Sequence, residues 1–260
     1  MIFSKYFRES LAISQRILIE LFRRKRSLIL WSFFPISLLI INSLIIADQN
    51  QISIAQAFEN IAPSTLVGVA LFFSCLGGTV STIVSEREQS TLKRLFLSPL
   101  SGFSYFIGIF IAHSFIGLGQ TLIVYTIAVC WGAKFQGSLL LPGLIIFLSI
   151  VSYVGLGFIL STQLARRTED VNSIVAAFGI PLLILGGSFF PSAFFPKSLL
   201  QIAKFNPIYH MNEALVGLIA NGYSFYQIRT HFIFLCIFSL LVLITAWICY
   251  QFMIRSERRL

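Results

Sequence analysis

Long apolar runs separated by short charged segments dominate the chain. Six of these runs contain no Asp, Glu, Lys or Arg, and each is close to the roughly 20 residues that a helix needs to cross a bilayer. They cover residues 27–46, 62–84, 103–130, 139–162, 171–190 and 231–251. The alternating pattern of a membrane-spanning strand is missing. The chain is therefore predicted to be an all-α polytopic membrane protein with six transmembrane helices.

The residues before the first run have a different pattern, with one apolar and several polar faces. A helical stripe contains Phe3, Phe7, Leu11, Leu18, Leu21 and Phe22, and the charged residues Lys5, Arg8, Glu9, Arg16 and Arg23 lie on other faces. We expect an amphipathic interfacial helix over residues 1–26 that lies at the membrane surface. One interpretation is that this helix only anchors the chain in the membrane. The other is that it also packs against a cytoplasmic partner.

Between the fifth and sixth runs lie two apolar stretches that are too short to span a membrane. They cover residues 198–205 and 208–220, and Asn206 and Pro207 separate them. Apolar segments of this length are expected to dip back into the outer leaflet as a re-entrant helical hairpin before the last span. Such a backbone is tolerated where it is buried in protein or lines a cavity. The alternative is a folded external cap.

Residues 85–95 form a short charged stretch between the second and third runs. Ser85 and Glu88 have the spacing of a capping box, and Pro99 would end a helix that begins there. Lys93 and Arg94 would lie towards the negative end of its dipole. The pattern predicts a short rigid helix that another protein can contact.

A second charged connection lies between the fourth and fifth runs. Arg166 and Arg167 precede Thr168, which we expect to cap the fifth helix, and two acidic residues follow in the first turn. Capping and topology account for these residues, and contact with a partner is the alternative.

Basic residues are concentrated on one side of the predicted spans. Of 19 Lys and Arg residues, 15 lie in the N-terminal segment, in the connections after the second and fourth runs, or in the C-terminal tail. The other side receives only Lys134, Lys197, Lys204 and Arg229. The positive-inside rule therefore predicts that both termini are cytoplasmic. Topology and lipid headgroups then account for the formal charge of +9, so membrane lipids are expected as partners and nucleic acid is not.

Two stretches of the chain resemble permease subunits of ABC-2 type transporters, the group that includes daunorubicin-resistance and nodulation-factor export permeases. The first is similar to the family's ERE-x-x-T-L-x-x-L…P segment and runs from Glu86-Arg87-Glu88 through Thr91-Leu92-Lys93-Arg94-Leu95 to Ser98-Pro99. The second runs from Gly186-Gly187-Ser188-Phe189-Phe190-Pro191 to Asn206-Pro207 and Tyr209. The order of parts also agrees over nearly the whole length. The resemblance implies a single transmembrane domain over residues 1–260, with a membrane part at 27–251 and a cytoplasmic tail at 252–260.

The resemblance also implies partners and a site. Permeases of this family pair as dimers and bind two copies of a cytoplasmic ABC ATPase, so a homodimer with two ATPase subunits is expected. The ATPase contacts would be Glu86, Arg87, Glu88, Thr91, Leu92 and Arg94, with Arg166 and Arg167 in the second cytoplasmic loop. An outer gate in the re-entrant segment would contain Gly186, Gly187, Phe189, Phe190, Pro191, Asn206, Pro207 and Tyr209. The expected location is the bacterial inner (plasma) membrane, with an organellar membrane of bacterial descent as the alternative.

The remaining chemistry indicates that the energy source lies on a partner. The sequence has no Gly-x-x-x-x-Gly-Lys-Ser/Thr phosphate loop, so ATP and Mg²⁺ are expected on the ATPase, and neither a bound cofactor nor an enzyme activity is expected of this chain. Charge-free spans favour export of a hydrophobic or amphipathic substrate, namely a drug, lipid, glycolipid or polysaccharide. An ion-coupled carrier would need ionisable groups at membrane depth, where His113 is the candidate. That carrier and a non-transporting membrane scaffold are the alternatives. An intramembrane enzyme would need a catalytic constellation, and none is evident.

Overall fold

The computed structural model describes residues 2–23, 25–97, 100–135, 139–165 and 167–257, and within these every regular element is a helix. The predicted all-α fold class is therefore confirmed. The elements are α1 (Ile2–Arg23), α2 (Lys25–Gln49), α3 (Ile54–Ser64), η1 (Thr65–Ala70), η2 (Phe72–Gly77), α4 (Gly78–Glu88), α5 (Thr91–Leu97), α6 (Gly102–Cys130), α7 (Leu140–Gln163), α8 (Thr168–Leu185), η3 (Ser192–Phe194), α9 (Lys197–Ala203), α10 (Pro207–Ile219) and α11 (Phe225–Glu257).

Six stretches of helix among the described residues are long and apolar enough to cross a membrane. They are Leu28–Gln49, Ile54–Glu88, Gly102–Cys130, Leu140–Gln163, Thr168–Leu185 and Phe225–Arg255, one for each predicted run. The second is longer than its run because α3, η1, η2 and α4 follow one another as a single helix. Both η1 and η2 are π-helical, a geometry that occurs frequently at functional sites.

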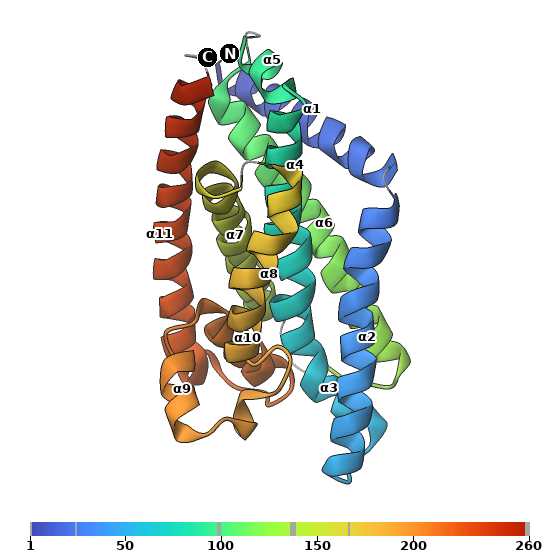
Figure 1. Ribbon diagram of the computed structural model, residues 1–260. Coiled ribbons are helices and arrows are strands. Elements are labelled where there is room, and N and C mark those ends of the chain that lie inside the picture. Colours follow the sequence, from blue (N-terminus) through green and yellow to red (C-terminus); the bar gives the residue numbers. More distant parts are fainter. Residues whose placement is uncertain (1, 24, 98–99, 136–138, 166, 258–260) are drawn as a thin grey trace.

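The bundle has two distinct ends. Both termini, α1, α5 and the connection between α7 and α8 lie at one end, whereas the α2–α3 turn, α9 and α10 lie at the other (Figure 1). We call these the terminal end and the distal end. The two ends correspond to the two sides into which the basic residues divide.

The interior is formed around the second membrane helix and α7. Helix α11 packs along α7, and α1 packs along α6. Near the terminal end, aromatic rings join α6, α7 and α11: Phe106 lies 4.4 Å from Phe158 and 5.6 Å from Tyr250 between ring centroids. Helices α2, α8 and α11 bury less than a quarter of their membrane-length segments, as expected for helices that face lipid or another protein.

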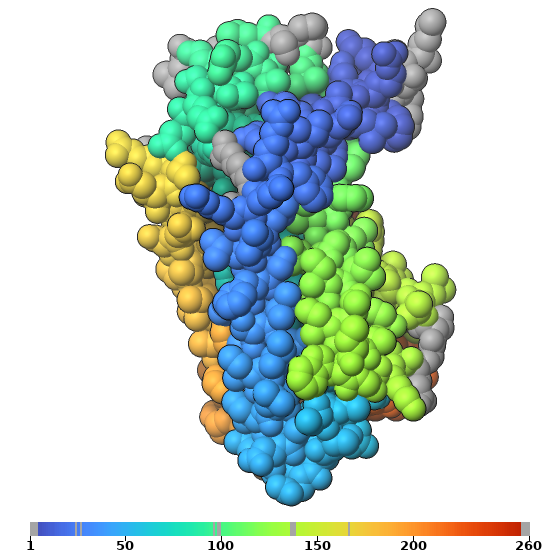
Figure 2. Space-filling view, turned by 90° about the vertical axis from the view of Figure 1, so that its right-hand side faces the viewer, coloured from blue at the N-terminus to red at the C-terminus, as the bar shows by residue number. Residues whose placement is uncertain are grey.

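Helix α1 lies across the upper part of the face on which α2 runs down beside α6 (Figure 2). Its buried side chains are Ser10, Ile13, Ser14 and Ile17. Helix α6 approaches closely at Gly108, where an added Cβ would lie 3.1 Å from the Ser10 carbonyl oxygen. Of the predicted apolar stripe, Phe7, Leu11 and Phe22 remain exposed, whereas Leu18 and Leu21 are partly buried against the core. The exposed members are left available for the membrane interface, and their contact with it remains a prediction.

The predicted short helix beginning at Ser85 is wrong. Helix α4 continues through Ser85 to Glu88, because the buried Ile83 and Val84 hold it in the bundle. A break follows at Gln89–Ser90, where Ser90 has a φ of +57°, and α5 then begins at Thr91. The Ser85 hydroxyl accepts a hydrogen bond from the Gln89 side-chain amide at 3.1 Å. Ser98 and Pro99 lie outside the described residues.

The start of the fifth membrane helix also differs from the prediction. Arg167 is the N-cap of α8, and its backbone N–H donates to the Asp170 carboxylate at 3.0 Å. Thr168 therefore does not cap this helix, since it is already the first helical residue. The helix ends at Leu185, earlier than the predicted residue 190.

Two short helices follow α8, as predicted. The Asn206 side chain caps α10 by accepting from the Ile208 backbone N–H at 3.0 Å, and Pro207 occupies the first turn. Helix α10 is largely buried against α3, α7 and α11. Its position at the distal end fits a re-entrant segment (Figure 1), and entry into a leaflet remains a prediction.

Candidate functional site

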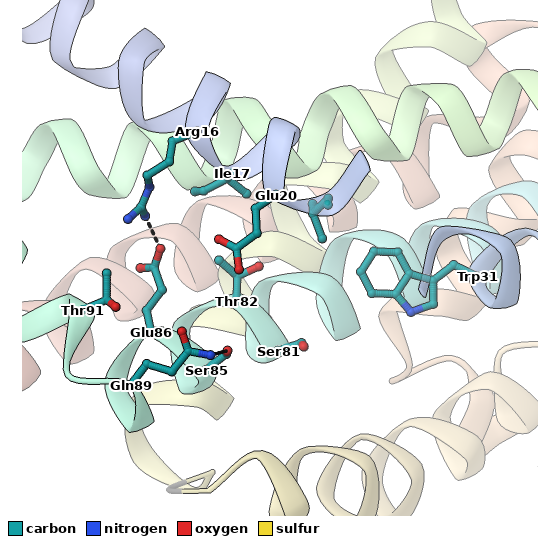
Figure 3. Close-up of a pocket in the computed structure, with 11 residues that line it drawn as sticks. Arg16, Ile17, Glu20, Trp31, Ser81, Thr82, Ser85, Glu86, Gln89 and Thr91 are labelled. Carbon is teal, nitrogen blue, oxygen red and sulfur yellow. Dashed lines mark hydrogen bonds and ion pairs between the residues drawn. The ribbon is translucent and has the colours of Figure 1, made fainter. Parts of the chain in front are cut away.

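A buried carboxylate joins three helices at the terminal end. Glu86 on α4 is only 6% exposed, and its carboxylate accepts a hydrogen bond from the Arg16 guanidinium on α1 (Figure 3). The same carboxylate also accepts from the Tyr105 hydroxyl on α6. A buried carboxylate is costly without such donors. The three side chains therefore hold α1, α4 and α6 together, and we call them the Glu86 triad.

A small polar pocket opens beside the Glu86 triad, between α1, α2 and α4 (Figure 3). Its volume is about 70 Å³, which suits a few water molecules. The lining residues are Arg16, Ile17, Glu20, Leu21, Trp31, Ser81, Thr82, Ser85, Glu86, Gln89 and Thr91.

The two residues after Glu86 reach other helices. An Arg87 nitrogen donates to the Ala165 carbonyl oxygen at 3.1 Å, and another lies 2.7 Å from the Met253 sulfur on α11. Glu88 accepts from the Thr168 backbone N–H at 3.2 Å and from the Thr168 hydroxyl. Successive side chains leave a helix about 100° apart. Three consecutive residues therefore connect α4 to α1, α6, α8, α11 and the α7–α8 connection.

The predicted contact residues divide into an inner and an outer set. Leu92 is fully buried, as Glu86 nearly is, and Arg87 and Thr91 are partly buried. The exposed residues around the Gln89–Ser90 break are Glu88, Gln89, Ser90, Lys93, Arg94 and Leu97, and Arg167 is also exposed. We call this set of seven the terminal-end surface. Arg166 lies outside the described residues.

A second carboxylate fastens α1 to the start of α6. Glu9 accepts from the Ser104 hydroxyl at 2.7 Å and from the Ser101 backbone N–H at 3.3 Å. The hydrogen bond from Ser104 is the main cause of a lowered pKa at Glu9; partial burial opposes it, and Ser101 and Lys5 add smaller lowering contributions. A lowered pKa in the folded state stabilises the docking above the ordinary carboxyl pKa, and this stabilisation is lost as pH falls through the lowered value.

Three side-chain amides hold the turn after α8 at the distal end. Asn212 on α10 donates to the Gly186 carbonyl at 2.7 Å and to the Ser188 hydroxyl at 2.9 Å. Asn206 donates to the Leu182 carbonyl at 2.6 Å, and Asn42 on α2 donates to the Phe189 carbonyl at 3.0 Å. We call this arrangement the amide clamp, because it supplies donors to the Gly186 and Phe189 carbonyls after the helix ends, and a second donor to the Leu182 carbonyl, which also accepts from the Gly186 backbone N–H.

The residues that the resemblance assigns to an outer gate lie in and around the amide clamp. Gly186 is buried against Ile208, and Gly187 adopts a φ of +81°, which favours glycine. The Phe189 ring lies 6.2 Å from Phe34 of α2, and Phe190 is exposed. The remaining assigned residues are the half-buried Pro191, the α10 cap Asn206, the first-turn Pro207 and the buried Tyr209.

Three residues at this end were not among the predicted gate residues: Asn42, Asn212 and Ser188, the last of which lies within the second resembling stretch. An asparagine inside an apolar segment is a signal of helix-to-helix hydrogen bonding, and Asn42 and Asn212 both fit it. Asn42 bonds to Phe189, 147 residues away, and Asn212 bonds to Ser188, 24 residues away. No local sequence pattern reveals partners at these separations.

A groove lies between α2 and α8 with the second membrane helix as its floor. Its volume is about 400 Å³. The lining combines apolar side chains with polar groups and consists of Leu30, Trp31, Phe72, Phe73, Gly77, Ser81, Thr168, Val171, Asn172, Val175, Ala176 and Ile180. We call it the α2–α8 groove.

These features define a multi-pass helical membrane protein with charged connections at its terminal end. Residues 8–220 match the family described as ABC-2 type transporter, and the chain belongs to this family. The resemblance inferred from the sequence is therefore confirmed.

Known relatives add a more specific likeness. Over 154 residues the chain is 30% identical to the probable multidrug ABC transporter permease YbhR of Escherichia coli strain K12, and equally to the permease of that name from Escherichia coli O157:H7. The matched stretch covers 59% of this chain and 40% of each relative, so the chain matches less than half the length of these relatives.

Proposed function

We propose that this chain is the membrane-spanning permease subunit of an ATP-binding-cassette exporter. It moves a hydrophobic or amphipathic substrate out of the cytoplasm with ATP hydrolysed by a separate ATPase subunit. Family membership supports the permease role, and the multidrug description of the relatives favours a drug over a lipid, glycolipid or polysaccharide. The chain itself holds neither ATP nor Mg²⁺ in this proposal.

The observation that carries the proposal is the connection between the terminal-end surface and the bundle. The ATPase contacts Glu88, Lys93, Arg94 and Arg167, which are exposed. A movement at the Gln89–Ser90 break would displace the end of α4 and so the helices bonded to it. Glu86 is bonded to α1 and α6. Arg87 contacts the α7–α8 connection and α11, and Glu88 is bonded to α8. Glu86, Arg87, Thr91 and Leu92 thus act inside the permease, and the terminal end faces the cytoplasm.

The substrate path follows from the exposed faces of α2 and α8. Two copies of the chain pair so that their α2–α8 grooves face each other, each copy bound to one ATPase subunit. The groove presents apolar side chains together with polar groups from Ser81, Thr168 and Asn172, which suits an amphipathic substrate. The amide clamp closes the distal end, where α9 and α10 enter the outer leaflet, and its release opens the path.

The ion-coupled alternative is disfavoured by the surroundings of His113. This side chain is fully buried, and its two ring nitrogens lie 3.1 Å from the Thr82 hydroxyl and 3.2 Å from the Ser74 carbonyl. Both nitrogens therefore have partners within the protein, as in a structural histidine.

The test is purification of the protein in native lipids with assays for a co-purifying ATPase and for ATP turnover. The wild type is expected to carry a stoichiometric ATPase. Charge reversal at the exposed pair Lys93→Glu and Arg94→Glu removes it, because both side chains are exposed and Arg94 makes only a local contact with Thr91 at 3.4 Å, so the reversal acts mainly on the partner surface. Lys197→Glu, an exposed reversal on α9 at the distal end, is the matched control and retains the ATPase.

Two results would contradict the proposal. One is a wild-type preparation with no nucleotide-hydrolysing partner, which would favour a non-transporting scaffold. The other is full retention of the ATPase by the Lys93→Glu/Arg94→Glu variant, which would place the docking surface elsewhere.

A further inference from the structure

Two of the three histidines of the chain meet at the distal end. His210 lies on α10 and His231 on α11, and their Nδ1 atoms are 3.0 Å apart with ring centroids 5.0 Å apart. No proton can lie on both Nδ1 atoms in this contact, so at least one of them presents a lone pair to the other.

The hydrogen bond of the other His210 nitrogen, Nε2, shows which of the two Nδ1 atoms has the lone pair. This Nε2 lies 2.9 Å from the Lys204 carbonyl oxygen, which can only accept, so Nε2 carries the proton. In the neutral ring Nδ1 is then unprotonated. The Phe234 ring stacks on His210 at 3.8 Å between centroids and fixes its plane. A ring N–H donated to a backbone carbonyl is the usual way in which a metal-bound histidine is oriented.

We propose that His210 and His231 form a binding site for a divalent transition-metal ion such as Zn²⁺ or Ni²⁺. Two Zn–N bonds of about 2.0–2.1 Å at a tetrahedral angle place their nitrogens about 3.3 Å apart, so the rings need to separate by only a few tenths of an ångström. The proton on His231 Nδ1 moves to its own Nε2 through solvent, so two neutral rings bind the ion without net proton release.

The surroundings favour a cation that exchanges readily. Glu213, one turn after His210 on α10, lies close enough to affect His210 electrostatically and adds negative charge. The described residues contain no group of three or more His, Cys, Asp or Glu side chains that could hold a metal. The ion therefore keeps water ligands. Imidazole donors select zinc, nickel or copper over magnesium and calcium.

A bound ion would tie α11 to α10, the helix that also carries a residue of the amide clamp. Asn212 of the amide clamp is only two residues from His210 on α10. Such an ion holds the distal end in the form seen here. The inference concerns a site outside the terminal end and is independent of the proposed transport function.

The test uses tag-free full-length protein in lipid nanodiscs, since a polyhistidine tag would itself bind the ion. Thermal unfolding is followed over a micromolar series of Zn²⁺ or Ni²⁺, and bound zinc is counted after dialysis. We expect one ion per chain and a midpoint that rises with ion concentration, with reversal by EDTA and no effect of Mg²⁺. The His231→Gln variant is expected to bind roughly 10-fold or more weakly, because one of two protein ligands is lost.

Controls separate a lost ligand from a disturbed fold. Gln201→Ala, an exposed substitution on the neighbouring α9, keeps the wild-type response to zinc. His210→Gln also loses the Lys204 contact, so His231→Gln, at a half-buried side chain, is the decisive variant. Equal zinc binding by wild type and His231→Gln, or no stoichiometric zinc on the wild type, would overturn the proposal. Neither result depends on an ATPase.

Discussion

Glu86 and Glu88 show how two nearly adjacent acidic residues acquire different roles. The first faces the interior and accepts from Arg16 and Tyr105, whereas the second is exposed and accepts from Thr168. The motif that contains them was recognised from the sequence. Their partners were not, because Arg16 is 70 residues away and Thr168 is 80 residues away.

This difference predicts unequal effects of removing each carboxylate. Glu86→Ala leaves the Arg16 guanidinium and the buried Tyr105 hydroxyl without their acceptor, so we expect a loss of about 2–4 kcal/mol in the free energy of unfolding. Glu88→Ala is expected to cost no more than about 1 kcal/mol, because its contact is exposed. Chemical unfolding in detergent micelles measures both. Equal losses would show that the Glu86 triad does not hold the helices together.

At the scale of elements, the second membrane helix touches the distal turn at Gly68. A Cβ added to Gly68 would press on the Ser188 side chain and lie 3.2 Å from the Asn212 Oδ1. Gly119 on α6 is a useful contrast, because a Cβ added there meets nothing within 4 Å. Both glycines lie in helices that are candidates for crossing the membrane.

Replacing each glycine by alanine is therefore predicted to change the stability of the protein in opposite directions. Gly68→Ala disturbs the amide clamp and is expected to destabilise the protein by about 1–3 kcal/mol. Gly119→Ala is expected to stabilise it by up to about 1 kcal/mol through helix propensity, since no packing is disturbed. Thermal unfolding in the same nanodiscs compares them. A destabilised Gly119→Ala variant, or an unaffected Gly68→Ala variant, would contradict this account of the packing.

At the scale of the whole molecule, the two ends of the bundle follow the charge pattern. The charged N-terminal segment and both basic connections lie at the terminal end, and the less basic turns lie at the distal end (Figure 1). The described helices therefore alternate in direction as the positive-inside rule requires.

This arrangement predicts which end a membrane-impermeant thiol reagent reaches in intact cells. In a background with the four native cysteines replaced, Gln51→Cys and Lys134→Cys are expected to label, because these exposed residues lie at the distal end, which is predicted to face away from the cytoplasm. Lys93→Cys and Arg255→Cys at the terminal end are expected to label only after lysis. The reverse pattern would place the termini outside and remove the proposed ATPase surface from the cytoplasm.

The sequence by itself determined the six membrane helices, their order, the two short helices before the last one and the family. Apolar length and charge bias are local properties of the chain, so they can be found without knowing its contacts. Element ends were less certain, as Ser85 and Thr168 show, because capping competes with the packing of neighbouring turns.

Only the tertiary structure decided which side chains face one another. In the structure Glu86 and Leu92 are buried, although the motif does not distinguish them from its exposed residues. Asn42, Asn206 and Asn212 come together around one turn. These outcomes depend on how each helix is rotated and which helix it meets. Both follow from packing between residues far apart in the chain, and the local pattern of apolar and polar positions does not specify them.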